Sequence, residues 1–179
     1  MVTVLLADVV ATSGTVAATR SRKAKVAAIA ELLARAGSEE LETVTAYVGG
    51  ALRQRRTGLG WRGLTALPPP AERSTLTVLE VHEAFERIAA LAGAGSQAAR
   101  AAAVAELFGR ATAEEQQWLR GVVTGEVRQG ALDSLVQEAN GLVEQIALLN
   151  PRIAQLEASG SLRSSTHCCR MPRRLLHAQ

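Results

Sequence analysis

Apolar residues recur at helical spacing along most of this chain, and glycine or proline repeatedly interrupts the pattern. Because an α-helix turns once in about 3.6 residues, such spacing gathers apolar side chains on one face. The sequence also has thirty-three alanines and only 3% aromatic residues, which favours closely packed helices over a sheet. With 179 residues, the chain can bury a hydrophobic core. We therefore expect an all-α, compact multi-helix protein with about seven helices and short loops.

Glycine marks the expected ends of the first three helices, where it commonly terminates a helix. The expected stops are Gly14, Gly37 and Gly49-Gly50. We expect the first helix over residues 4–12 and the start of the second near Ser21. Ser38 is placed to cap the third helix, whose first turn carries glutamates, including Glu40, that complement the positive end of the helix dipole.

The middle of the chain contains one long loop followed by three further helices. Residues 53–70 lose the helical period and end in three consecutive prolines, which cannot continue a helix. Thr77 and Glu80 then have the spacing of a capping box, and Thr112 and Glu115 repeat it. These two pairs predict the starts of two amphipathic helices, with another helix between them.

The character of the sequence changes after Ala139. Leucine and isoleucine repeat at heptad spacing from Leu142 to Leu156, which predicts a helical extension over residues 140–159 that Asn150-Pro151 interrupts. Residues 160–179 have no period, and we expect them to be disordered. The composition of this tail also suggests translation in a wrong frame or a chimeric gene end.

The basic pI of about 9.4 arises largely from the end of the chain. Residues 161–179 contain four arginines and no acid, whereas residues 1–160 carry 16 basic and 17 acidic residues. Overall charge is therefore no evidence for nucleic-acid binding, which must rest on local clusters. The uncharged stretches are too short to span a membrane and the N-terminus lacks a basic signal region, so we expect a cytoplasmic protein without a membrane partner.

Residues of the kinds that enzymes use do not form a recognisable catalytic pattern. The three histidines are scattered, and His82 is expected on a helix as a surface or half-buried residue. Neither Lys23 nor Lys25 is followed by the Asp-Gly of a nucleotidyl-transfer nucleophile, and no phosphate-binding loop or nucleophile elbow is present. We expect no catalytic residue and no metal ligand, and the adjacent Cys168 and Cys169 imply neither a disulfide framework nor a zinc site.

Two clusters of cations and two glycine-containing segments are candidate phosphate-binding features. The clusters are Arg20, Arg22, Lys23 and Lys25 at a helix start, and Arg53, Arg55, Arg56 and Arg62 in the long loop. Cations oppose the dipole at a helix start unless an anion is the partner, although a solvated helix face is the alternative. The glycine-containing segments are Gly93–Gln97, in which Ser96 can cap the next helix, and Gly125–Gly130. Each could present backbone N–H groups to phosphate, with Arg100 and Arg128 adding charge, or could be an ordinary helix cap.

Residues 93–139 read GAGSQAARAAAVAELFGRATAEEQQWLRGVVTGEVRQGALDSLVQEA. The order of a Gly-Ser helix start, Leu-Phe, Ala-Thr-x-Glu-Glu, an aromatic-Leu pair and Gly-Glu-x-Arg-Gln-Gly-Ala resembles the helical N-terminal DNA-binding domain of ATP-dependent DNA ligases. Upstream segments, including Gly58-Leu59-Gly60-Trp61, also resemble this family, most closely its actinobacterial members. The resemblance covers residues 1–139, which we take as the helical domain of this chain, and it stops near Ala139, before the family's own helical domain ends.

The resemblance implies a helical clamp that holds duplex or nicked DNA across the minor groove, through phosphate and sugar contacts that are independent of sequence. By analogy, one contact site is Gly95, Ser96 and Gln97, with Arg100 nearby. The second is Arg128, Gln129 and Gly130, and the basic run contributes Arg22 and Lys23.

The family's chemistry lies in a downstream adenylation domain with a Lys-x-Asp-Gly motif and in an OB-fold domain, and this sequence contains neither. ATP and Mg²⁺ are therefore implied only for a full-length family member. We expect a monomeric chain, truncated before the adenylation domain, that is unable to ligate alone unless a separate catalytic chain completes it. The alternative is a helical interaction or scaffold protein that pairs through Leu142–Leu156 and has no DNA affinity.

Overall fold

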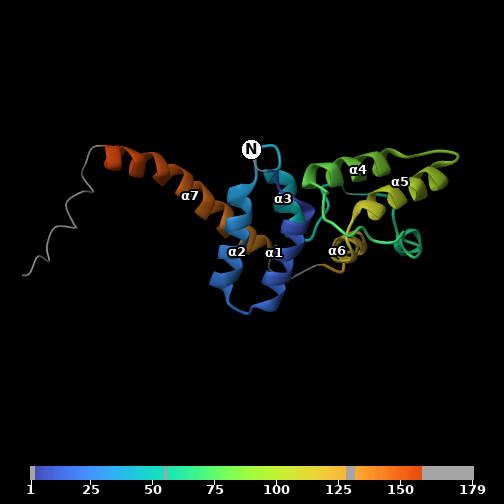
Figure 1. Cartoon of the computed structure of the whole chain (residues 1–179), viewed down its shortest axis with the longest axis horizontal. Coiled ribbons are helices and arrows are strands. Elements are labelled where there is room, and N and C mark those ends of the chain that lie inside the picture. Colours follow the sequence, from blue (N-terminus) through green and yellow to red (C-terminus); the bar gives the residue numbers. More distant parts are fainter. Residues whose placement is uncertain (1–2, 55, 128–131, 159–179) are drawn as a thin grey trace, which may run out of the picture. The chain divides into compact units, whose positions relative to one another are not determined.

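The computed structural model describes residues 3–54, 56–127 and 132–158, and this part of the chain contains α-helices, one short 3₁₀-helix and no strand. The all-α prediction is confirmed. In chain order the elements are α1 (Leu6–Ala18), α2 (Arg22–Arg35), α3 (Leu41–Val48), η1 (Trp61–Leu64), α4 (Val78–Ala90), α5 (Ser96–Arg110), α6 (Ala113–Thr124) and α7 (Leu132–Ala158) (Figure 1).

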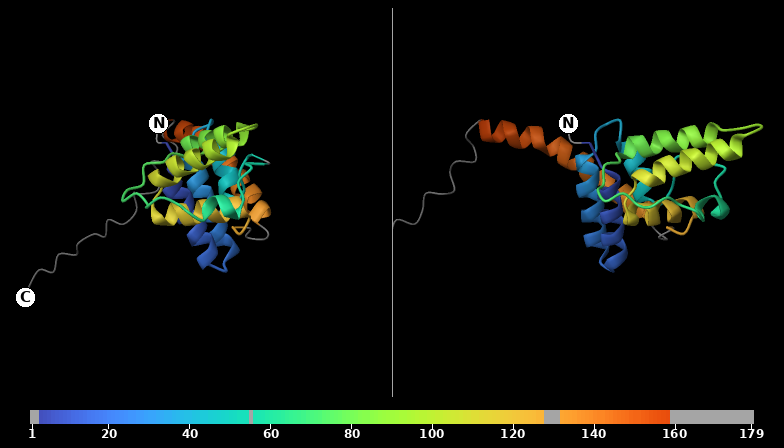
Figure 2. Two further views of the ribbon diagram at one scale, coloured as in Figure 1. Left: turned by 90° about the vertical axis from the view of Figure 1, so that its right-hand side faces the viewer. Right: turned by 45° about the vertical axis from the view of Figure 1, so that its right-hand side comes forward.

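The chain divides into two units, Met1–Val143 and Glu144–Gln179. In the first unit, α1 and α2 form one helical hairpin, and α4 and α5 form another (Figures 1 and 2). The described part of the second unit is the remainder of α7.

The N-terminal segment connects α1 to the start of α4. The N–H of Leu6 donates to the carbonyl of Leu76 at 2.8 Å, and the N–H of Val78 donates to the carbonyl of Val4 at 3.1 Å. These two bonds flank an isolated antiparallel bridge between Leu5 and Thr77. Segments more than seventy residues apart in the sequence are therefore held together by backbone hydrogen bonds.

Gly14 lies inside α1 and does not end it, so the predicted stop is wrong. A glycine in a helix interior costs roughly 1 kcal/mol relative to alanine, which packing can outweigh. Beyond it, Val16 is buried in the core and supplies that packing. Gly37 likewise does not cap α2, because the capping residue is Ala36.

The start of α3 differs from the prediction in a way that matters for the fold. Glu40, not Ser38, is the N-cap residue, and its side chain is only 5% exposed. The carboxylate accepts the N–H of Val4 at 3.2 Å and that of Gly37 at 3.1 Å. Glu40 therefore satisfies two backbone donors and ties the N-terminal segment to the α2–α3 turn.

Both predicted capping boxes are confirmed. At α4, Thr77 Oγ1 accepts the N–H of Glu80 at 3.2 Å, and the Glu80 carboxylate accepts the N–H of Thr77 at 2.9 Å. That backbone bond, followed by one from Arg110, lowers the pKa of Glu80. At α6, Thr112 and Glu115 make the same reciprocal bonds.

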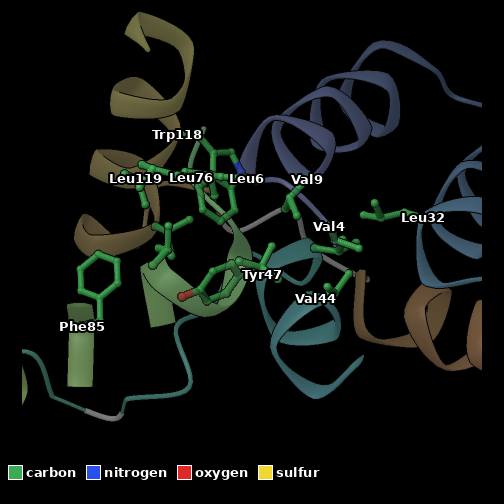
Figure 3. Close-up of a cluster of buried hydrophobic side chains, with 14 of the residues drawn as sticks. Val4, Leu6, Val9, Leu32, Val44, Tyr47, Leu76, Phe85, Trp118 and Leu119 are labelled. Carbon is green, nitrogen blue, oxygen red and sulfur yellow. The ribbon is translucent and has the colours of Figure 1, made fainter. Parts of the chain in front are cut away.

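The core of the first unit gathers apolar side chains from the N-terminal segment and several helices around two aromatic residues (Figure 3). The rings of Tyr47 on α3 and Trp118 on α6 lie 5.7 Å apart, tilted by 55°. Burial raises the pKa of the Tyr47 hydroxyl. Figure 3 also shows Val4, Leu6, Val9, Leu32, Val44, Leu76, Phe85 and Leu119.

Helix α7 continues through Asn150-Pro151 to Ala158, so the predicted interruption is wrong. Proline removes one backbone donor, but its fixed φ is compatible with a helical backbone. Leu142 and Ile146 of the heptad pattern are 39% and 52% exposed. The tail over residues 160–179 lies outside the described residues. Among those described, no helix combines the length and apolar character needed to cross a membrane.

We expect Glu40→Ala to lower the free energy of unfolding by about 1–3 kcal/mol, because it leaves the N–H groups of Val4 and Gly37 without their acceptor. Urea unfolding followed by circular dichroism measures this change. The matched control is Glu39→Ala, an exposed neighbour that should stay within about 0.5 kcal/mol of wild type. Equal effects of the two substitutions would contradict the role assigned to Glu40.

Candidate nucleic-acid interface

The start of α5 is open to solvent and has no side-chain cap. Gly95 is the N-cap residue with φ of +82°, a left-handed conformation that favours glycine. Ser96 is the first helical residue, so its predicted capping role is wrong. Among the described residues, the N–H groups of Gln97 and Ala98 have no hydrogen-bond acceptor. This helix start therefore offers two backbone donors, together with the positive end of the helix dipole.

The glycine-rich part of the long loop lies against this open helix start. A groove of about 650 Å³ runs between them, with Arg62 and Gly63 from the loop and Ser96, Gln97 and Arg100 from α5 in its walls. Two features that the sequence offered separately, the arginine-containing loop and the Gly-Ser helix start, thus form one surface. Residues 43–71, which contain this loop, include no aspartate or glutamate.

Arg100 is committed to the protein's own structure. Its guanidinium Nη2 donates to the carbonyl of Leu91, which ends α4, at 2.6 Å. The same guanidinium packs on Gly58, where φ is +66° and an added Cβ would lie 3.1 Å from Arg100 Cζ. Arg100 therefore fastens the α4–α5 hairpin to the loop and lines the groove at the same time.

The residues of the basic run at the start of α2 differ in whether a carboxylate is their partner. Ser21 caps α2 by accepting the N–H of Ala24 at 3.3 Å. Arg22 Nη2 lies 2.7 Å from the carboxylate of Glu138 on α7. Lys23 is exposed and has no carboxylate partner within the part of the chain that the structure describes. Neither Arg22 nor Lys23 lines the groove at α5, so these residues form a separate surface.

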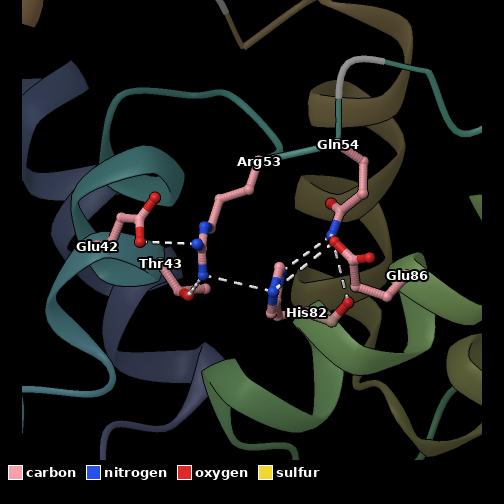
Figure 4. A network of polar contacts seen from close by, with 6 residues as sticks. All are labelled: Glu42, Thr43, Arg53, Gln54, His82 and Glu86. Carbon is pink, nitrogen blue, oxygen red and sulfur yellow. Dashed lines mark hydrogen bonds and ion pairs between the residues drawn. The ribbon is translucent and has the colours of Figure 1, made fainter.

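The arginines of the second cluster also differ in their partners, and Figure 4 shows the contacts of Arg53. Arg53 reaches the carboxylate of Glu42 at 2.6 Å, the hydroxyl of Thr43 at 3.2 Å and the ring of His82 at 3.4 Å. Gln54 extends this network to Glu86 at 2.7 Å. Arg53 is thus occupied within the fold. His82 was expected on a helix as a surface or half-buried residue, and it lies on α4 with its side chain 17% exposed.

Two other arginines of this cluster remain available. Arg56 and Arg62 are exposed, and neither forms an ion pair with any described carboxylate. Arg55 lies outside the described residues.

Arg128, Gln129 and Gly130, the second predicted phosphate site, also lie outside the described residues. Just before them, Gly125 ends α6 with φ of +76° and therefore closes one helix without opening the next. The carbonyl of Val127 approaches Gly50 so closely that an added Cβ there would lie 2.9 Å away.

Trp61 and Arg120 are not among the predicted site residues. Trp61 is 54% exposed, and the guanidinium carbon of Arg120 lies over its ring, 5.3 Å from the centroid. The signal was a tryptophan in a glycine-rich loop that contains no acid, outside any helical periodicity.

The described residues contain no group of three or more histidine, cysteine, aspartate or glutamate side chains able to hold a metal ion. Neither lysine of the sequence precedes Asp-Gly, so the residues present do not fit an adenylation centre. The fold and the groove define an all-α protein whose open, positively polarised helix start suits an anionic ligand.

Comparison with known proteins identifies the family of this chain. Residues 64–140 match the family model described as DNA ligase N terminus. The chain is 75% identical over 164 residues to a probable DNA ligase of Nocardioides sp., covering 89% of this chain and 32% of that protein. It is 58% identical over 163 residues to one of Kineococcus radiotolerans, with the same two coverages. The chain belongs to the DNA ligase family, in which it corresponds to the N-terminal region.

The chain spans about a third of the length of these curated relatives. A match over 89% of the chain requires more than the residues 1–139 that the sequence analysis assigned to the resemblance. The family model itself ends at residue 140, close to the predicted limit at Ala139, whereas the likeness to these two relatives extends into the part of α7 that follows.

We expect Arg100→Ala to lower the free energy of unfolding by about 1–2 kcal/mol, because it removes a charged hydrogen bond to the end of α4. Thermal unfolding followed by circular dichroism checks this. Arg87→Ala, which truncates an exposed arginine near the end of α4, is the control and should change stability by less than about 0.5 kcal/mol. An unchanged melting temperature in Arg100→Ala would show that the bond to Leu91 does not stabilise the fold.

Proposed function

We propose that this chain is the DNA-binding part of an ATP-dependent DNA ligase and grips duplex DNA around a nick through its phosphate backbone. The enzyme would act in DNA repair, replication or recombination in the cytoplasm. ATP and Mg²⁺ would be used by an adenylation domain outside this sequence, or on a separate catalytic chain. This chain alone would bind DNA as a monomer and would not seal it.

The open start of α5 beside the arginine-containing loop is the observation that carries this proposal. Free N–H groups and the helix dipole favour a phosphate at that position, and the exposed Arg62 in the same groove adds charge. Such contacts recognise the DNA backbone and not its bases, which suits a protein that must act at nicks of any sequence.

The basic run on α2 provides a second contact under this proposal. Lys23 is exposed without a described carboxylate partner, so it is free to approach a phosphate. Arg22 is paired with Glu138, but both side chains are about half exposed. Because exposed ion pairs stabilise by only about 0–1 kcal/mol, phosphate can displace Glu138 from Arg22 at little cost.

We expect the affinity for a nicked duplex to fall steeply with salt and to depend little on sequence, because binding releases counterions from the phosphates. Lys23→Ala should reduce the slope of log K against log salt by about 0.9, the contribution of one phosphate contact. Fluorescence anisotropy of labelled DNA over a salt series measures both the affinity and the slope.

Arg35→Ala is the matched control, since Arg35 lies at the other end of α2 and is paired with Asp8 at 3.2 Å. Its slope should equal that of wild type. Absence of any duplex binding by the wild-type chain would refute the proposed function. If the molecular mass of the chain in solution, measured by size exclusion, also rose with protein concentration, the alternative of self-association through the heptad pattern would be favoured. Leu142 and Ile146 of that pattern are exposed.

We expect Gly95→Ala to weaken duplex binding about tenfold, because a methyl group at the N-cap obstructs a phosphate approaching the free N–H groups. Gly93→Ala is a control matched for strain, since Gly93 also has positive φ, and an added Cβ at either position meets no atom within 4 Å. Both variants therefore lose similar stability, and anisotropy isolates the effect of position. Equal losses of affinity in the two variants would exclude α5 as the phosphate site.

A further inference from the structure

Trp61 is an exposed tryptophan that the fold does not need for its core. The other tryptophan, Trp118, is buried among core residues, whereas Trp61 leaves about half of its surface in water. Tryptophan has a large apolar ring, and such rings dominate the energetics of interfaces when another molecule covers them. A single exposed apolar residue is nevertheless ordinary, so exposure alone does not define a site.

Two separate elements contribute to the position of the Trp61 ring. Trp61 opens η1, in which Gly63 N–H donates to the carbonyl of Gly60 at 2.9 Å and Leu64 is buried as an anchor. The guanidinium of Arg120, from α6, lies over the ring. Trp61 of η1 and Arg120 of α6 thus form a cation–π pair at the surface, with one residue from each element.

The charges around this pair suit a polyanion. Arg120 forms no ion pair with any carboxylate in the described ranges, and its guanidinium lies over the Trp61 ring instead. Trp61 belongs to the acid-free segment of residues 43–71, and its neighbours Gly60 and Arg62 line the groove at the start of α5. Trp61 therefore stands beside the surface to which the phosphate contact was assigned.

We propose that Trp61 and Arg120 form an additional contact with duplex DNA, in which the ring packs on a deoxyribose at the edge of the minor groove and Arg120 approaches the adjoining phosphate. This inference rests on the proposed function. It goes further by assigning an apolar contact with sugar to two residues outside the predicted sites.

The geometry favours a sugar over a base as the partner of the ring. An intercalating ring needs both faces free to lie between two bases, but Arg120 covers one face of Trp61. A deoxyribose in a duplex presents an apolar surface beside a phosphate and needs only one face or edge of the ring. The aromatic ring and the guanidinium match these two neighbouring groups in chemistry.

The test measures the binding of a nicked duplex and of a single strand of the same sequence to the complete chain. Trp61→Ala should weaken duplex binding about tenfold without changing the salt slope, since the lost contact is apolar. Trp61→Phe should retain most of the affinity. Arg120→Gln should reduce the slope by about 0.9, because it removes one phosphate contact.

Leu41→Ala is the control for removing an exposed apolar side chain, since Leu41 is 38% exposed at the start of α3. Its affinity should match that of wild type. Circular dichroism should show unchanged helix content in Trp61→Ala. DNA should also protect the wild-type tryptophan fluorescence from acrylamide quenching, and this protection should be absent in Trp61→Ala, where only buried Trp118 remains.

The outcomes separate this inference from the proposed function. If the wild-type chain binds duplex DNA and Trp61→Ala binds it equally well, the inference is overturned and the proposed function stands. If the loss in Trp61→Ala is larger on the single strand than on the duplex, the ring stacks on an unpaired base, which also overturns the contact with sugar. If the wild-type chain binds no DNA, the proposed function itself fails.

Discussion

The carboxylate of Glu40 and the backbone bonds of residues 4–6 hold the first unit together. Glu40 fixes the N-terminal segment to the α2–α3 turn, and the same segment bonds to residues 76–78 at the start of α4. The hairpin of α1 and α2 is thereby joined to the hairpin of α4 and α5. Because the N–H of Val4 is buried beside this carboxylate, the connection is specific: without an acceptor, desolvation of that donor would oppose folding.

Local signals in the sequence were sufficient to predict the class of fold and those helix starts that side-chain caps determine. The Thr77–Glu80 box is an example, since all of its bonds form within four residues. Two predicted helix ends were wrong: α1 continues past Gly14, where the buried Val16 supplies packing, and α7 continues past Pro151. The role of Glu40 could not be predicted, because its partner Val4 is thirty-six residues away in the sequence.

The candidate site was predictable in part for the same reason. The Gly-Ser start of α5 is a local pattern, and the structure places it where the sequence indicated. Partners of the arginines are long-range, so four similar residues in one loop could not be distinguished beforehand. Folding occupies Arg53 with Glu42 and leaves Arg62 exposed in the groove. Arg100 adds a further case, since its partner is the carbonyl that ends the preceding helix.

These partners explain how a chain region with nearly balanced charge can present a surface for a polyanion. Ion pairs such as Arg35 with Asp8 and Arg110 with Glu80 neutralise cations locally and contribute little field beyond about a Debye length. Cations without such partners among the described residues, including Arg62 and Arg120, lie in or against a segment that contains no acid. Under the proposed function, the distribution of partners, and not the net charge, therefore determines where phosphate would be attracted. The uncapped start of α5 adds hydrogen-bond donors of fixed direction beside these cations. Its N–H groups belong to the backbone and cannot turn, whereas arginine side chains can adjust to a ligand.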